Sequence, residues 1–183
     1  SASEAKKVAE WMINLGIAHK ALRWTGPKPR TGIQSAARNA RYELMFQWCH
    51  ENDVNTLLLG HHRDDQAETY LMRLGRGSGP NGLACMATST ARNGVKMVRP
   101  MLAVPKSRLV STCHSIGQAW IDDPSNRDPR YARTHIRTSL ETHKDGAALA
   151  EMARSYGIAR ATRDGKIREL LCATATEFSQ GFV

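Results

Sequence analysis

The sequence lacks the features of a secreted, membrane-spanning or metal-ribbon protein. Its four cysteines lie far apart and form no C-x-x-C pair, which argues against a zinc ribbon and a thioredoxin-type motif. No signal peptide is visible, and no apolar run approaches the ~18 residues of a membrane span. We therefore expect a soluble, cytoplasmic protein whose thiols are free.

Aromatic residues are also scarce, at 6%, so a stacking platform for single-stranded nucleic acid is not evident. Acidic residues are outnumbered, because 26 Lys and Arg face 17 Asp and Glu, which gives a formal charge of +9. This balance favours a polyanionic partner, most simply nucleic acid. On charge alone, a basic domain without such a partner is an equally good interpretation.

Hydrophobic periodicity predicts alternating helices and strands up to about residue 122, which is typical of an α/β fold with a parallel sheet. Helices are expected over 1–15, 33–51, 65–74 and 105–116, and strands over 17–24, 54–59, 95–98 and 118–121. The continuous apolar run at 54–59 suits a strand covered on both faces. Later helical patterns, separated by Gly146 and Gly157, predict an α/β domain over 1–137 and a helical extension over 138–183.

Polar side chains gather directly after the expected strand at 54–59: His61, His62, Asp64 and Asp65. Open α/β sheets bind ligands at the carboxyl ends of their strands. Histidine together with carboxylate can bind a metal or move protons. This group therefore indicates an enzyme-like site.

A structural explanation competes with that one. Asp65 followed by Glu68 has the spacing of a capping box, which only begins a helix. On the functional interpretation, Asp64 and Glu68 are four residues apart and would place two carboxylates on one helix face. The cap alone leaves both histidines and Asp64 unexplained.

The glycine-rich run RGSGPNG, residues 76–82, is a second candidate, for an anion site. Glycines let successive N–H groups converge on an anion, and Arg76 adds charge. The alternative is that Gly77 merely ends a helix. The run is not a Walker loop, because G-x-x-x-x-G-K-S/T is absent.

Arginines form two further groups. Arg38 and Arg41 lie three apart on the expected helix at 33–51, and Arg130, Arg133 and Arg137 share one face if their segment is helical. Guanidinium groups suit phosphate binding. A solvated basic face is the alternative for both groups.

Four segments carry a family resemblance: GHHRDDQAETYLMRLGRGSGPNGLACM (60–86), TGIQSAARNARYELM (31–45), VRPMLAVPKSRL (98–109) and IDDPSNRDPRYARTHIR (121–137). Together they resemble the tRNA(Ile)-lysidine synthetases, members of the PP-loop ATP pyrophosphatase superfamily. The resemblance covers about residues 1–140 in the family's order. It implies a parallel sheet of the PP-loop, adenine nucleotide alpha hydrolase-like (Rossmann-like) type.

The resemblance also implies a reaction. ATP, with Mg2+, would adenylate the wobble cytidine of a tRNA(Ile) with a CAU anticodon, and the amine of free L-lysine would then displace AMP. Catalytic roles are implied for His61, Asp65, Glu68 and Arg41. Substrate or phosphate binding is implied for six residues: Arg76, Gly77, Ser78, Gly79, Arg133 and Arg137. Family members are often homodimers, and no membrane partner is implied.

The sequence departs from the family in two places. Thr134 stands where the family usually has asparagine, next to Arg133. The S-G-G-x-D-S loop, which cradles the ATP pyrophosphate in the family, does not occur in the sequence. We therefore expect an N-terminally truncated piece of a longer protein that is inactive on its own.

Three other functions fit parts of the same pattern. A tRNA thiolase of the 2-thiocytidine type would use paired cysteines, and none occur here. A metal-dependent phosphoesterase could use His61, His62, Asp64 and Asp65. A non-catalytic RNA-binding module would need only the basic face.

Overall fold

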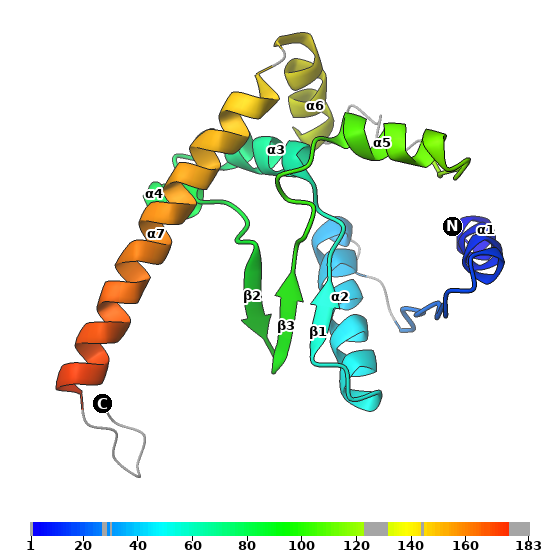
Figure 1. The fold of residues 1–183 in the computed structure, drawn as a ribbon, viewed down its shortest axis with the longest axis horizontal. Helices are drawn as coiled ribbons and strands as arrows, with labels where there is room; N and C mark the ends of the chain where they lie inside the picture. Colours follow the sequence, from blue (N-terminus) through cyan, green and yellow to red (C-terminus); the bar gives the residue numbers. More distant parts are fainter. Residues whose placement is uncertain (1, 27–28, 30, 123–131, 144, 176–183) are drawn as a thin grey trace. The chain divides into compact units, whose positions relative to one another are not determined.

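The computed structural model describes residues 2–26, 29, 31–122, 132–143 and 145–175 (Figure 1). The chain divides into two compact units, Ser1–Leu58 with Ser89–Val98, and Leu59–Thr88 with Arg99–Val183. Each unit is described by itself below. The domain boundary expected at residue 137 stays a prediction.

The first unit holds helices α1 (Ala2–Asn14) and α2 (Ile33–Glu51) and strands β1 (Thr56–Leu58), β2 (Ser89–Arg92) and β3 (Val95–Val98). The sheet order is β1-β3-β2, with β1 parallel and β2 antiparallel to β3. The predicted α/β class is confirmed, as are both helices and the strand at 95–98. The sheet is mixed rather than purely parallel, because β2 adds an antiparallel edge.

The core of this unit follows two sequence periods. Helix α2 buries Tyr42, Phe46 and Cys49, which are spaced for one helix face. Strand β3 alternates, with Val95 and Met97 buried and the residues after each more exposed. The apolar side chains that define these elements are therefore those that leave water on folding.

The β2–β3 hairpin was missed by the sequence analysis. Asn93 and Gly94 form its turn, with φ of 50° and 72°. Asn-Gly is the dipeptide that a type I′ turn favours, because both central residues need positive φ. Arg92, at the end of β2, donates to Glu43 Oε1 at 2.7 Å and lies 5.4 Å from the Phe46 ring centroid, which joins the hairpin to α2.

Two predicted strands are wrong, and a third differs from expectation. Residues 17–24 and 118–121 form no strand. A strand needs a neighbour for its backbone groups, and no strand in the described part of the chain pairs with 17–24. The N–H of Gln118 instead closes helix α5 (Lys106–Ser115), by bonding to Cys113 O at 2.8 Å. Strand β1 forms, but Leu58 is 66% exposed, so it is not covered on both faces.

The second unit contains α3 (Arg63–Leu74), α4 (Pro80–Leu83), α5, α6 (Ala132–His143) and α7 (Gly146–Thr174). Helix α7 packs along α3 and α4, and α6 packs against α3 (Figure 1). The helices expected at 65–74 and 105–116 are confirmed as α3 and α5, with shifted ends.

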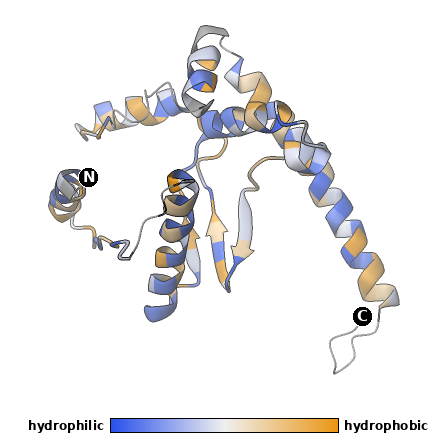
Figure 2. Cartoon of the chain, turned by 180° about the vertical axis from the view of Figure 1, so that it is seen from behind, coloured by the Kyte–Doolittle hydropathy of each residue, from blue (hydrophilic) through white to orange (hydrophobic). Residues whose placement is uncertain are grey.

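Gly157 does not interrupt α7, contrary to prediction. A Cβ at this position would lie 3.8 Å from the carbonyl oxygen of Ala84, which is ordinary van der Waals contact, so the helix could accommodate a larger residue here. Hydrophobic and hydrophilic residues mix along the whole helix (Figure 2). Although α7 has 29 residues, no helix in the described ranges is long and apolar enough to cross a membrane.

The core of the second unit lies between α3, α4 and α7. It consists of Tyr70, Leu83, Cys85 and Ala153, against which Leu149 and Tyr156 pack. Beside it, the Gln66 side chain donates to Met86 O at 2.9 Å and accepts from Met86 N at 3.0 Å. This pair of bonds fixes α3 against the segment that follows α4.

This core predicts a loss of stability at alkaline pH. Burial raises the pKa of the Cys85 thiol, against the opposing charges of Arg73 and Arg160, and burial also raises the pKa of Tyr70. The unfolded chain therefore ionises first, so stability is full below the ordinary thiol pKa of 9.0 and falls as pH rises above it. Urea unfolding measured between about pH 8 and 10.5 checks this.

Cys85→Ala should make the decline with pH shallower, even though it lowers stability at every pH by leaving a small cavity. Cys172→Ala is the control, because Cys172 is exposed and should leave the slope unchanged. Equal slopes for Cys85→Ala and the unmodified protein would contradict the assignment to Cys85.

Candidate active site

Helix α3 begins with a capping interaction that places the polar residues after β1. The His62 N–H donates to Asp65 Oδ2 at 3.0 Å, and His62 Nε2 lies 3.5 Å from the same oxygen. Asp65 is thus the third residue of a helix that starts at Arg63. The capping pair expected from Asp65 and Glu68 is wrong, because the helix extends further back and Asp65 caps His62 instead.

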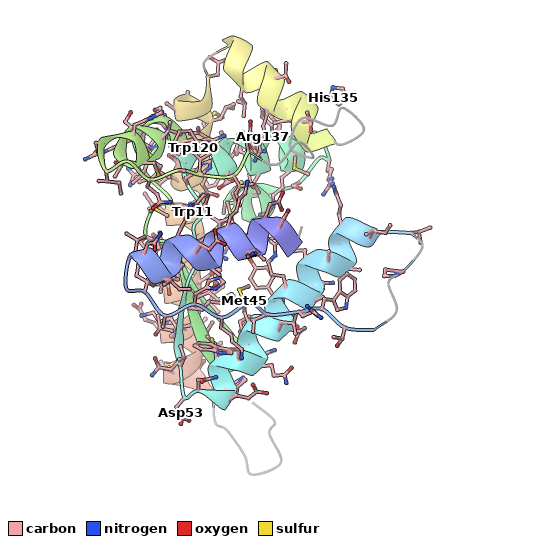
Figure 3. The ribbon with its side chains drawn as sticks, turned by 90° about the vertical axis from the view of Figure 1, so that its right-hand side faces the viewer. Trp11, Met45, Asp53, Trp120, His135 and Arg137 are labelled. Atoms are coloured by element: carbon pink, nitrogen blue, oxygen red, sulfur yellow. The ribbon has the colours of Figure 1, made fainter. Side chains whose placement is uncertain are left out.

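Glu68 is a buried carboxylate one turn into the helix. Its side chain is 3% exposed, and Arg137 Nε of α6 donates to Glu68 Oε1 at 2.5 Å. Figure 3 shows Arg137 and His135 leaving α6 on different sides. A buried ionised carboxylate needs a cationic partner. The Arg137 guanidinium of α6 provides that cation for Glu68 of α3.

A cavity of about 270 Å³ opens at this pair. It is lined by His62, Arg63, Asp64, Glu68, Lys106, Arg137, Leu140, Gly146 and Ala147. Three cationic side chains and two carboxylates therefore share one small space, which suits a ligand that carries charges of both signs.

The first turn of α7 forms one wall of the cavity. Gly146 and Ala147 are small, so backbone N–H groups at the positive end of a long helix come close to the space. Next to this wall, the buried atoms His62 Nδ1 and Arg63 Nε have no hydrogen-bond partner among the described residues, although Arg63 Nε lies 3.8 Å from Asp64 Oδ1. Polar atoms of this kind are typical of a site that receives a ligand.

The structure brings together only some of the predicted site residues. Glu68 and Arg137 meet in the cavity, whereas Asp65 caps the helix and His61 is not a lining residue. Arg41 is exposed on α2, in the first unit. Arg133 falls within α6, but its side chain lies outside the described residues, as do Arg127 and Arg130 entirely.

The glycine-rich loop closes α3 with its own amides. Gly77 has φ +69°, its N–H bonds to Leu74 O at 2.9 Å, and the Ser78 N–H bonds to Arg73 O at 3.0 Å. This is a Schellman closure of the helix. These N–H groups are therefore occupied, and the exposed Arg76 side chain is the group that the loop offers to an anion.

Several lining residues were missed as site residues. Arg63 adjoins the acidic pair, and Lys106 follows Pro105 at the start of a helix, so both were visible as charged residues at helix starts. His62 and Asp64 were candidates for a metal-dependent phosphoesterase, but the family resemblance implied no role for them. Gly146 carried no signal, because only the packing of α7 brings it to the cavity.

Comparison with known proteins decides the family. A family model described as PP-loop domain matches residues 1–144. The chain belongs to the PP-loop domain family.

Relatives of this PP-loop domain share one name. It is 42% identical over 179 residues to the tRNA(Ile)-lysidine synthase of Rhodopseudomonas palustris, covering 97% of this chain and 51% of that protein. It is 45% identical over 155 residues to that of Methylobacterium nodulans, covering 84% and 46%. The chain thus spans about half the length of the curated relatives it matches.

Among solved structures, the PP-loop domain resembles the U34-tRNA thiolase NcsA from Methanococcus maripaludis, determined with its 4Fe-4S cluster. The TM-score is 0.66 at 18% identity, covering 85% of this chain and 56% of that one. At this identity the likeness shows the fold alone, and it agrees with the predicted PP-loop type of fold.

The donor set of the PP-loop domain fits magnesium better than zinc. Among the described residues, no group of three or more His, Cys, Asp or Glu side chains is arranged for a metal ion. Mg2+ is usually bound by one or two carboxylates together with substrate phosphates. Asp64 and Glu68 line the same cavity and could supply those carboxylates.

The Glu68–Arg137 pair should couple the two helices energetically. We expect Arg137→Met to lower the free energy of unfolding by about 2 kcal/mol, since it leaves a buried carboxylate without its charged donor. The expected loss in the free energy of unfolding is smaller than that for breaking a fully buried ion pair, because Arg137 is 30% exposed. The double variant Glu68→Gln with Arg137→Met should lose less than the sum of the single losses.

Urea denaturation of the four proteins in this cycle measures the coupling. Arg154→Met serves as a control, because its partner Glu151 is exposed and unfolding should hardly change. Strict additivity of the two single losses would show that the pair contributes no coupling.

Proposed function

We propose that the complete protein containing this chain ligates lysine to the wobble cytidine of a tRNA(Ile) with a CAU anticodon, using ATP. The observation that carries this proposal is the 42% identity to a lysidine synthase across 97% of the chain. The mixed charges of the cavity support it, because the reaction joins an anionic nucleotide and a zwitterionic amino acid.

The proposed reaction has two steps. The C2 carbonyl oxygen of cytidine attacks the α-phosphate of ATP and displaces pyrophosphate. The lysine amine then attacks C2, forming a carbon–nitrogen bond and releasing AMP with the former carbonyl oxygen. Both steps develop charge that fixed cations and carboxylates can stabilise.

Glu68 is the proposed acid–base group of the cavity. It is buried, paired with Arg137 and part of the cavity lining, which supports the proposal that it takes the proton that the lysine amine loses. Arg63 and Lys106 are proposed to offset the negative charge of the adenylate and pyrophosphate. Arg137 is therefore assigned here to holding Glu68, although the resemblance implied phosphate binding.

The other implied residues keep proposed roles. His61 would act near the activated base, and Asp65 would fix the start of α3. Arg41 would contact phosphate or the adenylate, and Arg133 would hold phosphate or the tRNA backbone. The loop of Arg76, Gly77, Ser78 and Gly79 is proposed to bind phosphate through the Arg76 guanidinium, because the Gly77 and Ser78 N–H groups close the helix.

Magnesium is proposed to accompany ATP, with Asp64 as its carboxylate, because Glu68 is proposed for proton transfer. When bound, the ion would neutralise phosphate charge. The cytoplasmic location, the free-lysine substrate and a homodimer remain parts of the proposal. The division into an α/β catalytic domain over 1–137 and a helical extension over 138–183 is also part of the proposal.

The test is lysine incorporation by the complete gene product. It is incubated with ATP, labelled lysine and a tRNA that carries a CAU anticodon, and a tRNA with another anticodon serves as the control. Label in the first tRNA alone, dependent on ATP, is the expected result. Salt-sensitive tRNA binding without incorporation would favour an RNA-binding module, and phosphodiester hydrolysis without ATP would favour a phosphoesterase.

A single substitution should abolish the chemistry while keeping the fold. We expect Glu68→Gln to lower the rate of incorporation by about 10²-fold or more, because the amide cannot accept a proton. Thermal unfolding should remain cooperative with a lowered midpoint, because the amide oxygen can still accept from Arg137 but carries no charge. The control is Glu169→Gln, on the exposed surface of α7, which should retain full activity. Full activity of Glu68→Gln would refute the proposed acid–base role of Glu68.

A further inference from the structure

The segment after the glycine-rich loop is held by arginines from two helices. Arg73 of α3 donates to Gly82 O at 2.5 Å. From α7, Arg160 donates to Asn81 O at 3.3 Å, and Arg163 donates to Asn81 Oδ1. Helix α4 thus carries three guanidinium groups around it.

The acceptors of these three guanidinium groups at α4 are all neutral carbonyl oxygens, so the bonds to α4 do not themselves compensate the positive charge. The charge of Arg73 and Arg160 acts on its surroundings, since both lower the pKa of Cys85 against the effect of burial. An arginine bound to a carbonyl also retains further N–H donors.

The positive surface continues on both sides of α4. Arg76 is exposed in the loop, and Lys166 is exposed one helical turn beyond Arg163. Asp164 reduces the charge locally, with Oδ1 3.5 Å from Arg163 Nη2, but both side chains are about half exposed and the pair is weak.

Another arginine of α7 behaves differently. The Nε atom of Arg154 donates to both carboxylate oxygens of Glu151 at 3.0 Å, so its charge is compensated. From the helical period, Arg154 lies on the side of α7 opposite Arg163. The charge of Arg154 is therefore compensated, unlike that of the arginines bound to α4, although the exposed Arg168 lies on the same side of α7 as Arg154.

We propose that Arg73, Arg76, Arg160, Arg163 and Lys166 form a surface that binds the phosphodiester backbone of RNA, separate from the cavity at the start of α3. This inference rests on the proposed function for its partner. The surface has no stacked aromatic platform among the described residues that form it, so it binds backbone phosphates regardless of sequence.

Lys166→Glu tests the surface without touching the contacts to Asn81. Binding of the complete protein to tRNA(Ile) is measured over a range of salt concentrations. The affinity should fall about tenfold, because a charge reversal removes one phosphate contact and repels a second. The slope of log affinity against log salt should become shallower by about one.

The matched control is Arg154→Glu, which changes the net charge equally on the opposite side of the same helix. It should lose much less affinity than Lys166→Glu. Asp164→Asn should have the opposite effect and bind RNA more tightly. Equal losses for Lys166→Glu and Arg154→Glu would mean that only total charge matters, and would overturn the proposed surface.

Two further measurements separate this inference from the proposed function. The loss for Lys166→Glu should be the same with a tRNA of unrelated anticodon, because the surface contacts backbone. Lysine incorporation by the unmodified protein is assayed in parallel. Absence of incorporation refutes the ligase, whereas normal incorporation with unchanged RNA affinity of Lys166→Glu refutes the surface alone.

Discussion

The buried carboxylate of Glu68 is the constraint on which the candidate site depends. With its side chain 3% exposed, it requires the Arg137 guanidinium, and Arg137 comes from a helix distant in sequence. That requirement brings α6 onto α3 and encloses the cavity that α7 completes. The chemistry proposed for the site and the packing of the unit thus share one ion pair.

Local sequence predicted the elements whose own residues determine them. Helix α2 follows from the spacing of Tyr42, Phe46 and Cys49, and β3 follows from the alternation of Val95 and Met97. Elements that depend on neighbours were predicted poorly. Residues 17–24 have strand-like composition but no described partner strand, and Gly157 lies within a continuous helix whose neighbouring residues pack against α3 and α4.

The candidate site shows the same contrast between features that local sequence predicts and features that tertiary packing determines. The family motif directed attention to α3 and Glu68, and the arginine spacing included Arg137, yet their direct contact was not predicted. Lys106 and the first turn of α7 reach the cavity through tertiary packing that no local pattern encodes. Asp65 was assigned to chemistry, whereas in the structure it accepts the N–H of His62.

Helix α3 fixes the distance between the cavity and the glycine-rich loop. Glu68 at the cavity and Leu74, the last residue of the helix, lie ~9 Å apart along the helix axis at the usual rise per residue, and Arg76 follows in the closing turn. The bonds from Gln66 to Met86 and from Arg73 to Gly82 hold the segments around that axis in place. A free amino acid is too short to touch both ends at once. A single ligand that contacted the cavity and the loop together would therefore have to be longer than a free amino acid, whereas a small substrate would occupy one end only.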